Sequence, residues 1–312
     1  MSSQIVNKPL PYIALILAHL IWGANFVVAK ITLQEFPPMS LALLRFALAS
    51  LFLAPFFLSQ TKKVKIDKKD LPKLVAVGVF IITLNIAFFF EGIRRTTAID
   101  ASVLTMIIPI LSVLIGWLYF KEKIYLVNLL GIGAAFLGAA VLIGLPQFFT
   151  GTYSTQMLLG NIFIVLASIS WVAGAVISKK VLKKYPSLIV TAIAFMVGTL
   201  AMLIPAGLEY LNNPSWPSQI TILGLLGLTY MTLLSSISAY FLFEWGLAKT
   251  TITAADLFQY IEPFIATFLA VTILEERISS SFLIGSLLIA IGVFLGTLAK
   301  SIHRRHHKAH RV

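Results

Sequence analysis

The sequence predicts an all-α integral membrane protein, with ten transmembrane helices in two inverted five-helix repeats and both termini in the cytoplasm. Three observations support this prediction: the composition, the number of long apolar runs, and a repeat between the halves of the chain. Of the 312 residues, 59% are hydrophobic and only 12% are charged, and the mean hydropathy is +0.94. Such a chain has too little polar surface for a water-soluble globule, which excludes a soluble enzyme or a nucleic-acid-binding module.

Ten apolar runs are long enough to form transmembrane helices. A helix that crosses about 30 Å of hydrocarbon, at about 1.5 Å per residue, needs about 20 apolar residues. The first run has no small-residue cleavage site, so we expect a retained helix and not a signal peptide. In chain order the runs are residues 10–31, 39–58, 71–93, 97–120, 124–145, 157–180, 187–209, 220–247, 252–274 and 278–300.

Positive charge is concentrated in alternate loops. If the N-terminus lies inside, the segments on that side hold 19 of the 24 Lys and Arg residues, and the opposite loops hold only Lys30, Arg94, Arg95 and Arg277. Cytoplasmic loops near the membrane collect Lys and Arg, so both termini are predicted to be cytoplasmic. The positive net charge is therefore a signal of topology, and it requires no nucleic-acid partner.

An internal repeat relates the two halves of the chain. Matching residues are 149 apart in the first helix of each half and 154 apart in the later helices. The pairs include Trp22 and Trp171, Lys30 and Lys179, and Pro37 and Pro186 at the first offset, and Pro109 and Pro263, Glu122 and Glu276, and Gly138 and Gly292 at the second. Because five spans are an odd number, the second half enters the membrane from the opposite side, an arrangement typical of secondary transporters.

This repeat predicts the domain organisation. A first five-helix repeat occupies residues 1–145, and a linker loop occupies residues 146–156. A second five-helix repeat occupies residues 157–300, and residues 301–312 form a basic cytoplasmic tail. The tail contains several histidines, but a solvated basic segment near anionic lipid is a better interpretation than a metal site.

Several stretches resemble the EamA-type repeat of the drug/metabolite transporter superfamily. They are WGANFVVAK, LRFALA and AIDASVLTMIIPILSVLIGWLYFKEK in the first half, and TAADLFQYIEPFIATFLAVTILEER in the second. The resemblance covers nearly the whole chain. It implies a ten-helix secondary carrier in the inner or plasma membrane that exports a small metabolite, often an amino acid or a related compound.

Residues that could line a binding site lie near the middle of the runs. Pro109 and Pro263 interrupt regular helix at depth, where each could free a carbonyl for a ligand, or could simply be a tolerated kink. Trp22 and Trp171, with polar neighbours such as Asn25, could form a pocket wall for a zwitterion or an organic cation; the alternative is a packed aromatic core. Asn85, Phe89 and Tyr240 are further candidates, although such polar residues often only hydrogen-bond helices together.

Ionisable residues inside the membrane require an explanation, because burying a charge there is costly. Glu262 is the deepest acid and is the candidate for coupling proton movement to transport; the alternative is a structural carboxyl. His19 could titrate near neutral pH or bond to a neighbouring helix. For Arg45 we favour a structural pairing with a carboxylate such as Glu91 over contact with a substrate carboxylate. Glu244 lies closer to a helix end, where we expect water to hydrate its carboxylate at little energetic cost.

No sequence motif indicates enzyme chemistry. A P-loop, HExxH, GxSxG and a dinucleotide-binding glycine pattern are all missing from the sequence, so we expect neither a cofactor nor a metal. The expected partners are a small-molecule substrate and the lipid bilayer. The glycine-rich stretches GIGAAFLG and GVFLG predict close helix packing, either within one chain or across a homodimer.

Three alternatives to a coupled exporter stay open from the sequence. The first is an uncoupled facilitator or an importer of small organic solutes, which a test of proton-gradient dependence would distinguish. The second is an intramembrane enzyme that modifies lipids, which would need clustered carboxylates or a nucleophile beside a base. The third is a channel.

Overall fold

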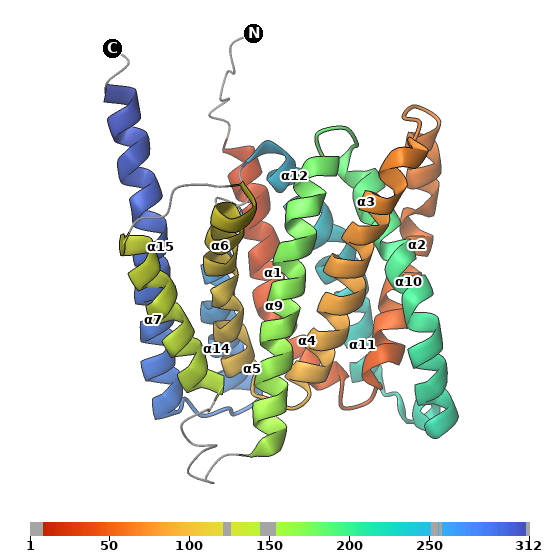
Figure 1. Cartoon of the computed structure of the whole chain (residues 1–312). Helices are drawn as coiled ribbons and strands as arrows, with labels where there is room; N and C mark the ends of the chain where they lie inside the picture. The colour runs from red at the N-terminus through yellow and green to blue at the C-terminus, as the bar shows by residue number, and fades with distance from the viewer. Residues whose placement is uncertain (1–8, 121–125, 144–153, 251–254, 256–257, 310–312) are drawn as a thin grey trace.

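The computed structural model describes residues 9–120, 126–143, 154–250, 255 and 258–309, and these residues form helices and connecting turns with no β-strand. Long helices run side by side in one bundle (Figure 1). The α-helices are α1 (Leu10–Thr32), α2 (Pro38–Thr61), α3 (Leu71–Val77), α4 (Asn85–Ile93), α5 (Ala98–Leu104), α6 (Ile108–Phe120), α7 (Leu126–Ile143), α9 (Thr155–Val181), α10 (Ser187–Asn212), α11 (Ile222–Tyr230), α12 (Ala239–Lys249), α14 (Ile261–Ile273) and α15 (Ser280–Ala309).

Short segments of other helix types join or precede several of these helices. Two are π-helices, η2 (Gly78–Leu84) between α3 and α4, and η5 (Met231–Ser238) between α11 and α12. The others are the 3-10 helices η1 (Lys68–Asp70), η3 (Thr105–Ile107), η4 (Trp216–Gln219) and η6 (Phe258–Tyr260). Because a π-helix continues the chain in nearly the same direction, α3–η2–α4 and α11–η5–α12 each cross the bundle as one stretch.

Seven helical stretches of the described residues are long and apolar enough to cross a membrane. They are Leu10–Thr32, Pro38–Thr61, Lys68–Ile93, Ala98–Ile115, Thr155–Val181, Ser187–Asn212 and Ile222–Lys249, and three shorter apolar helices span Leu129–Leu142, Phe258–Ile273 and Ser280–Gly292. Each stretch overlaps one of the predicted runs, in the same order. The prediction of an all-α chain with several apolar helices is confirmed.

A few sequence predictions concern residues beyond this description. Glu122 lies outside the described residues, and so does most of the predicted linker, of which only residues 154–156 are described. At the C-terminal end, α15 continues as far as Ala309, so the segment predicted as a tail begins as part of a helix.

The bundle exposes many large apolar side chains, and it buries several polar side chains within a largely apolar core. On the outside, Leu51, Ile204, Leu211 and Phe264 are each more than 70% exposed. Exposed apolar surface of this extent indicates contact with lipid. The buried side chains include His19, Arg45, Glu244 and Glu262, which are charged or titratable groups that lipid would not solvate.

Glycines allow α7 and α15 to pack closely together. A Cβ atom on Gly138 would lie 2.6 Å from the carbonyl oxygen of Gly285, and one on Gly292 would lie 2.5 Å from the backbone nitrogen of Ala135. Backbone atoms cannot move aside as a flexible side chain can, so both positions require glycine. These glycines of GIGAAFLG and GVFLG therefore serve packing within one chain, and a homodimer stays a prediction.

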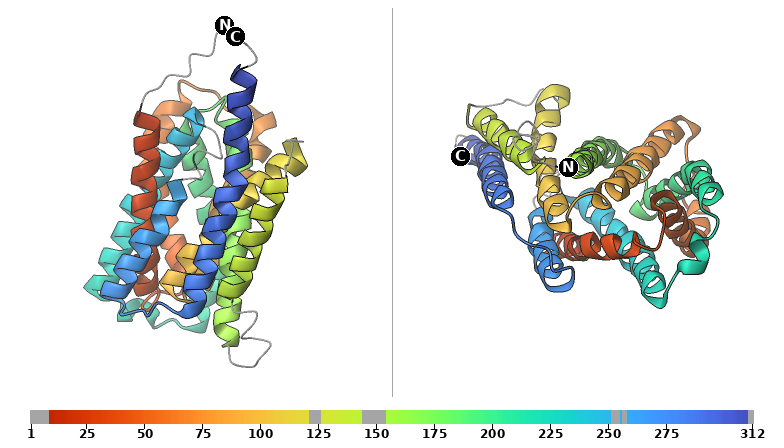
Figure 2. Two further views of the ribbon diagram at one scale, coloured as in Figure 1. Left: turned by 90° about the vertical axis from the view of Figure 1, so that its left-hand side faces the viewer. Right: turned by 90° about the horizontal axis from the view of Figure 1, so that it is seen from below.

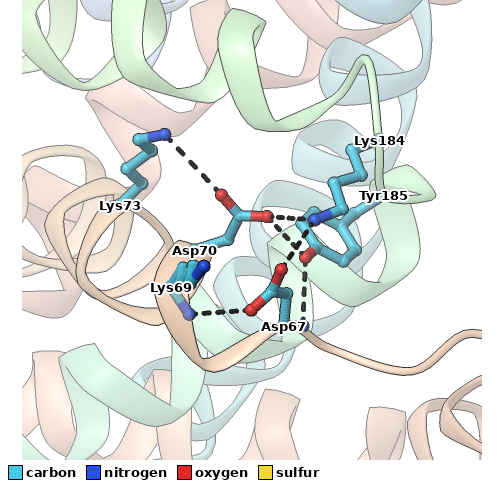
Figure 3. Close-up of polar contacts among 6 residues, drawn as sticks. All are labelled: Asp67, Lys69, Asp70, Lys73, Lys184 and Tyr185. Carbon is cyan, nitrogen blue, oxygen red and sulfur yellow. Dashed lines mark hydrogen bonds and ion pairs between the residues drawn. The ribbon is translucent and has the colours of Figure 1, made fainter.

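Lysine-rich segments meet at one end of the bundle. Lys184, in the turn after α9, lies 2.6 Å from an Asp70 carboxylate oxygen, and the Tyr185 hydroxyl donates a hydrogen bond to the same oxygen over 2.8 Å (Figure 3). The hydrogen bond with Asp70 raises the pKa of Lys184 above its usual value. The first turn of α1 and the last turn of α15 lie at this same end (Figures 1 and 2).

At the opposite end, glutamates bind the first amides of three helices. Glu209 accepts hydrogen bonds from the backbone nitrogens of Met39 and Ser40 at the start of α2. Glu276 accepts them from the first two residues of α5, and Glu35 accepts one from Thr221, the residue before α11. A carboxylate at a helix N-terminus satisfies free N–H groups and complements the helix dipole.

Candidate functional site

A cavity lies inside the bundle, between helices from both halves of the chain. Its wall includes residues from α1, α2, α4 and α6 of the first half and from α9, η5, α12 and α14 of the second. Eight of the ten residues predicted as site residues line it: His19, Trp22, Asn25, Asn85, Phe89, Trp171, Tyr240 and Glu262. The tertiary structure thus brings these residues together from five helices.

Trp22 and Trp171, the tryptophans related by the sequence repeat, are in contact at the cavity wall. Their ring centroids are 5.3 Å apart in an edge-to-face arrangement, and the Tyr240 ring lies 5.2 Å from Trp22. The Trp22 indole donates a hydrogen bond of 3.0 Å to the Ser235 carbonyl oxygen in η5. The aromatic residues are therefore both packed against one another and available to a ligand in the cavity.

His19 and Glu262 form a buried pair across the interface between α1 and α14. The distance from His19 Nδ1 to Glu262 Oε1 is 2.6 Å, and both side chains are at most 5% exposed. Gly23, one turn after His19, makes this approach possible, because a Cβ there would lie 2.9 Å from the Cβ of Ile265. Among the described residues, no three His, Asp or Glu side chains cluster as metal ligands would. The pair can instead hold a proton.

Pro109 and Pro263 do not line the cavity. Pro109 is the second residue of α6 and Pro263 the third residue of α14, and each helix follows a 3-10 turn, η3 or η6. Proline is tolerated in the first turn of a helix, because the missing N–H has no intrahelical partner there. The interruptions expected at these prolines thus lie just before them, and the neighbouring Ile108 and Glu262 face the cavity.

The asparagines take different roles in the wall. The Asn85 amide donates a 2.9 Å hydrogen bond to the Ala167 carbonyl and so links α4 to α9. The Asn25 side-chain oxygen is buried without a hydrogen-bond partner. Phe89 lies edge-to-face with Phe26, at 5.3 Å between ring centroids. Asn85 therefore holds helices together at the cavity, whereas Asn25 leaves an acceptor unused.

Arg45 lies deeper in the bundle than we expected. Its side chain is 1% exposed, and it donates hydrogen bonds to the hydroxyls of Ser236 and Ser235 in η5, at 2.6 and 3.0 Å. Glu91, the expected partner, instead forms ion pairs with Arg94 and Arg95. The predicted pairing was wrong because a helix-end position in the sequence does not reveal which face a side chain occupies.

Sequence reasoning missed some buried polar groups. Glu244 is 3% exposed and accepts a 2.7 Å hydrogen bond from Ser178, so it is not hydrated as we expected. Thr105 and Gln259 line the cavity and were not selected. Gln259 stands three residues before Glu262, so helical spacing from that acid was the signal that could have identified it.

Comparisons with known proteins agree with this architecture. The model of the EamA-like transporter family matches the chain twice, at residues 9–144 and 158–298. An uncharacterized transporter of Archaeoglobus fulgidus is 28% identical over 288 residues, which cover 92% of this chain and 96% of that protein. A probable amino-acid metabolite efflux pump of Salmonella typhimurium is 27% identical over 297 residues, which cover 93% and 95%.

A solved structure also has a similar fold. It is a crystal structure of a protein, and it superposes on this chain with a TM-score of 0.61. The superposition covers 93% of this chain and 96% of the other chain. At 16% sequence identity, the similarity extends to the fold alone.

Proposed function

Because this chain belongs to the EamA-like transporter family, we propose that it is a secondary carrier that exports a small metabolite, an amino acid or a related compound, by alternating access. The cavity is the observation that carries this proposal. It lies between the two halves and combines charged groups, amides and aromatic rings. A pocket with an apolar wall and a few polar groups suits a small organic molecule.

The proposed architecture is ten spans in two inverted repeats. It is supported by the two π-helices: η2 and η5 begin at Gly78 and Met231 and end at Leu84 and Ser238, separations of 153 and 154 residues. These separations match the offset of the sequence repeat. The packing partners match as well, because α1 packs against α12, and α9, its counterpart, packs against α4, the counterpart of α12.

Two repeat-related lysines make equivalent contacts, each within its own half: Lys30 donates to the Thr96 carbonyl, and Lys179 donates to the Thr250 carbonyl. Lys30 also lies 3.5 Å from a carboxylate oxygen of Glu276 in the second half. Lys30 and Lys179 stand near the C-terminal ends of α1 and α9, which lie at opposite ends of the bundle (Figure 1). Each lysine thus ties a helix of one half to a neighbouring turn, at one end only.

We also propose that transport is coupled to protons through His19 and Glu262. The pair lines the cavity, and both side chains are at most 5% exposed. A protonated pair is neutral overall, whereas loss of the proton leaves a negative charge that a cationic group of the substrate could balance. Proton and substrate would then compete for one site, which is the condition for exchange of one for the other across the membrane.

The proposed topology places both termini in the cytoplasm. The lysine-rich turns beside Asp70 and Lys184 lie at the same end as the first turn of α1, whereas the glutamates that bind helix N-termini lie at the other end. This asymmetry fits the tendency of positive loops to remain in the cytoplasm.

The test is release of a mixed metabolite pool from proteoliposomes, with and without a pH gradient, followed by mass spectrometry. The pool contains amino acids, amines, nucleosides and sugars. Selective and saturable release of one class, faster with the gradient, is the expected result. Empty liposomes are the control. No release above that control, from protein shown to be folded, would refute the carrier.

Other outcomes would select an alternative function. Saturable release that ignores the pH gradient would indicate an uncoupled facilitator, and accumulation only in the inward direction would indicate an importer. Ohmic currents without saturation in a bilayer recording would indicate a channel.

A further inference from the structure

Arg45 is a buried cation with an incomplete set of partners. Its guanidinium has five N–H groups, of which two are used by the hydroxyls of Ser235 and Ser236. Nη1 is buried and has no hydrogen-bond partner. Arg45 also has no ion pair within the described part of the chain: both of its hydrogen-bond partners are neutral hydroxyls, and its Cζ lies 5.0 Å from the centroid of the Phe46 ring. A buried charge of this kind is costly unless an anion balances it.

The guanidinium keeps N–H groups that the serine hydroxyls do not use. Arg45 is one of the residues that line the cavity. The two serine hydroxyls hold the guanidinium from Nε and Nη2, which leaves both N–H groups of Nη1 and one of Nη2. These are the groups that present two parallel donors, and two parallel donors match the two oxygens of a carboxylate.

We propose that Arg45 binds the carboxylate of the transported molecule and so restricts the cargo to compounds that carry one. This inference rests on the proposed carrier function and adds the group that the carrier recognises. Ser235 and Ser236 are positioning residues, because they hold the guanidinium through Nε and Nη2 and leave Nη1 without a partner.

The rest of the cavity fits a zwitterion with an apolar side chain. The Asn25 side-chain oxygen is an unused acceptor for an ammonium group, and the Glu262 carboxylate also lines the cavity. Trp22, Trp171 and Phe89 provide the apolar surface. A zwitterion adds no net charge to a cavity in which Arg45 and Glu262 carry opposite charges, so it enters at a lower electrostatic cost than a simple anion.

Arg45 could instead be only a tether between α2 and η5. The two roles predict different results when a carboxylic acid is compared with its own amide. A tether affects every cargo alike, whereas a carboxylate-binding residue distinguishes a carboxylate from its uncharged amide. A comparison of each acid with its amide therefore separates the two roles, in wild-type protein as well as in variants.

The experiment measures competition by defined probes in proteoliposomes. The reporter is exchange of whichever cargo the metabolite pool identifies, and the probes are L-leucine and L-phenylalanine, that cargo itself, and the amide of each. Wild-type protein should bind each active acid about 10- to 100-fold more tightly than its amide, the effect of losing a hydrogen-bonded charged partner. Arg45→Gln should reduce this ratio to about one, and Arg45→Lys should leave it intermediate.

A matched control is Arg95→Gln. Arg95 pairs with Glu91 and does not line the cavity, so this variant should keep the wild-type ratio. If Arg45→Gln does not fold, the wild-type ratios and Arg45→Lys still test the proposal. Wild-type release of a cargo without a carboxylate, equal competition by acid and amide, or a wild-type ratio in a folded Arg45→Gln would each overturn it while leaving the carrier intact. No release of any compound would refute the carrier itself.

Discussion

At the scale of single residues, the pair of His19 and Glu262 is the strongest candidate for proton coupling. Glutamine has nearly the shape of glutamate but cannot lose a proton. We therefore expect Glu262→Gln to abolish transport driven by a pH gradient while exchange of cargo down its own gradient continues. The measurement is cargo flux in proteoliposomes, with and without a pH gradient.

The matched control for this variant is Glu244→Gln. Glu244 is also buried and also accepts a hydrogen bond, from Ser178, but it does not line the cavity. The Glu244→Gln variant should therefore keep the wild-type response of cargo flux to the pH gradient. A wild-type response in Glu262→Gln would show that the pair is structural.

The Glu35 carboxylate should make the stability of the folded protein depend on pH. Hydrogen bonds from the Thr221 hydroxyl and backbone nitrogen lower the pKa of this carboxyl below its usual value. In the unfolded chain, a glutamate has a pKa of about 4.3. Because the pKa of Glu35 is lower in the folded protein, the ionised carboxylate stabilises the fold at any pH above about 4.3. This stabilisation is lost as the pH falls through the pKa of the folded protein.

We therefore expect Glu35→Gln to lower the melting temperature in detergent at neutral pH, because the amide binds Thr221 less strongly. The difference from wild type should be constant between about pH 6 and pH 8 and should shrink below about pH 4. A difference that grows on acidification would contradict this account.

At the scale of elements, the packing of α7 against α15 depends on glycine. A methyl group at Gly292 would lie 2.5 Å from two backbone atoms of α7, the Ala135 nitrogen and the Gly131 oxygen. The helices would have to separate, and such overpacking typically destabilises a protein by about 1–3 kcal/mol. We expect Gly292→Ala to lower the melting temperature in detergent.

Gly133 is the control within the same contact region. It lies on α7, and a Cβ there would meet nothing within 4 Å. Gly133→Ala should be neutral or stabilising, because alanine favours a helix by up to about 1 kcal/mol over glycine. Equal stability of the two variants would mean that α7 and α15 do not pack as described.

At the scale of the whole molecule, the proposed inverted topology predicts which surfaces face each side of the membrane. Glu35 and Lys184 are repeat-related, at an offset of 149 residues, and they contact the starts of α11 and η1 respectively. The chain has no cysteine, so each introduced cysteine is a unique label. We expect an impermeant maleimide to label Glu35→Cys from outside the cell and Lys184→Cys from the cytoplasmic side.

Asp67→Cys is the control for this labelling. A carboxylate oxygen of Asp67 lies 3.4 Å from the Lys184 Nζ atom. The cysteines of Asp67→Cys and Lys184→Cys should therefore react from the same side of the membrane. Labelling of Glu35→Cys and Lys184→Cys from one side of sealed vesicles would exclude the inverted arrangement.

Local properties of the sequence determined the class of this protein and most of its helices. An apolar run forms a helix in a membrane because its backbone groups must pair within the run, so composition and run length suffice. Proline marks two helix starts for an equally local reason: Pro38 is the first residue of α2, and Pro186 directly precedes α10. The constant offsets between matching residues predicted that the two halves of the chain have equivalent helices.

Only the tertiary structure decided which side chains meet. His19 and Glu262 are 243 positions apart, and Arg45 is about 190 positions from its two serines. Such contacts depend on how far each helix is rotated about its axis and on how closely glycines let helices approach. Those quantities come from the packing of the whole bundle, which explains why sequence reasoning selected the aromatic residues of the cavity but assigned Arg45 to the wrong partner.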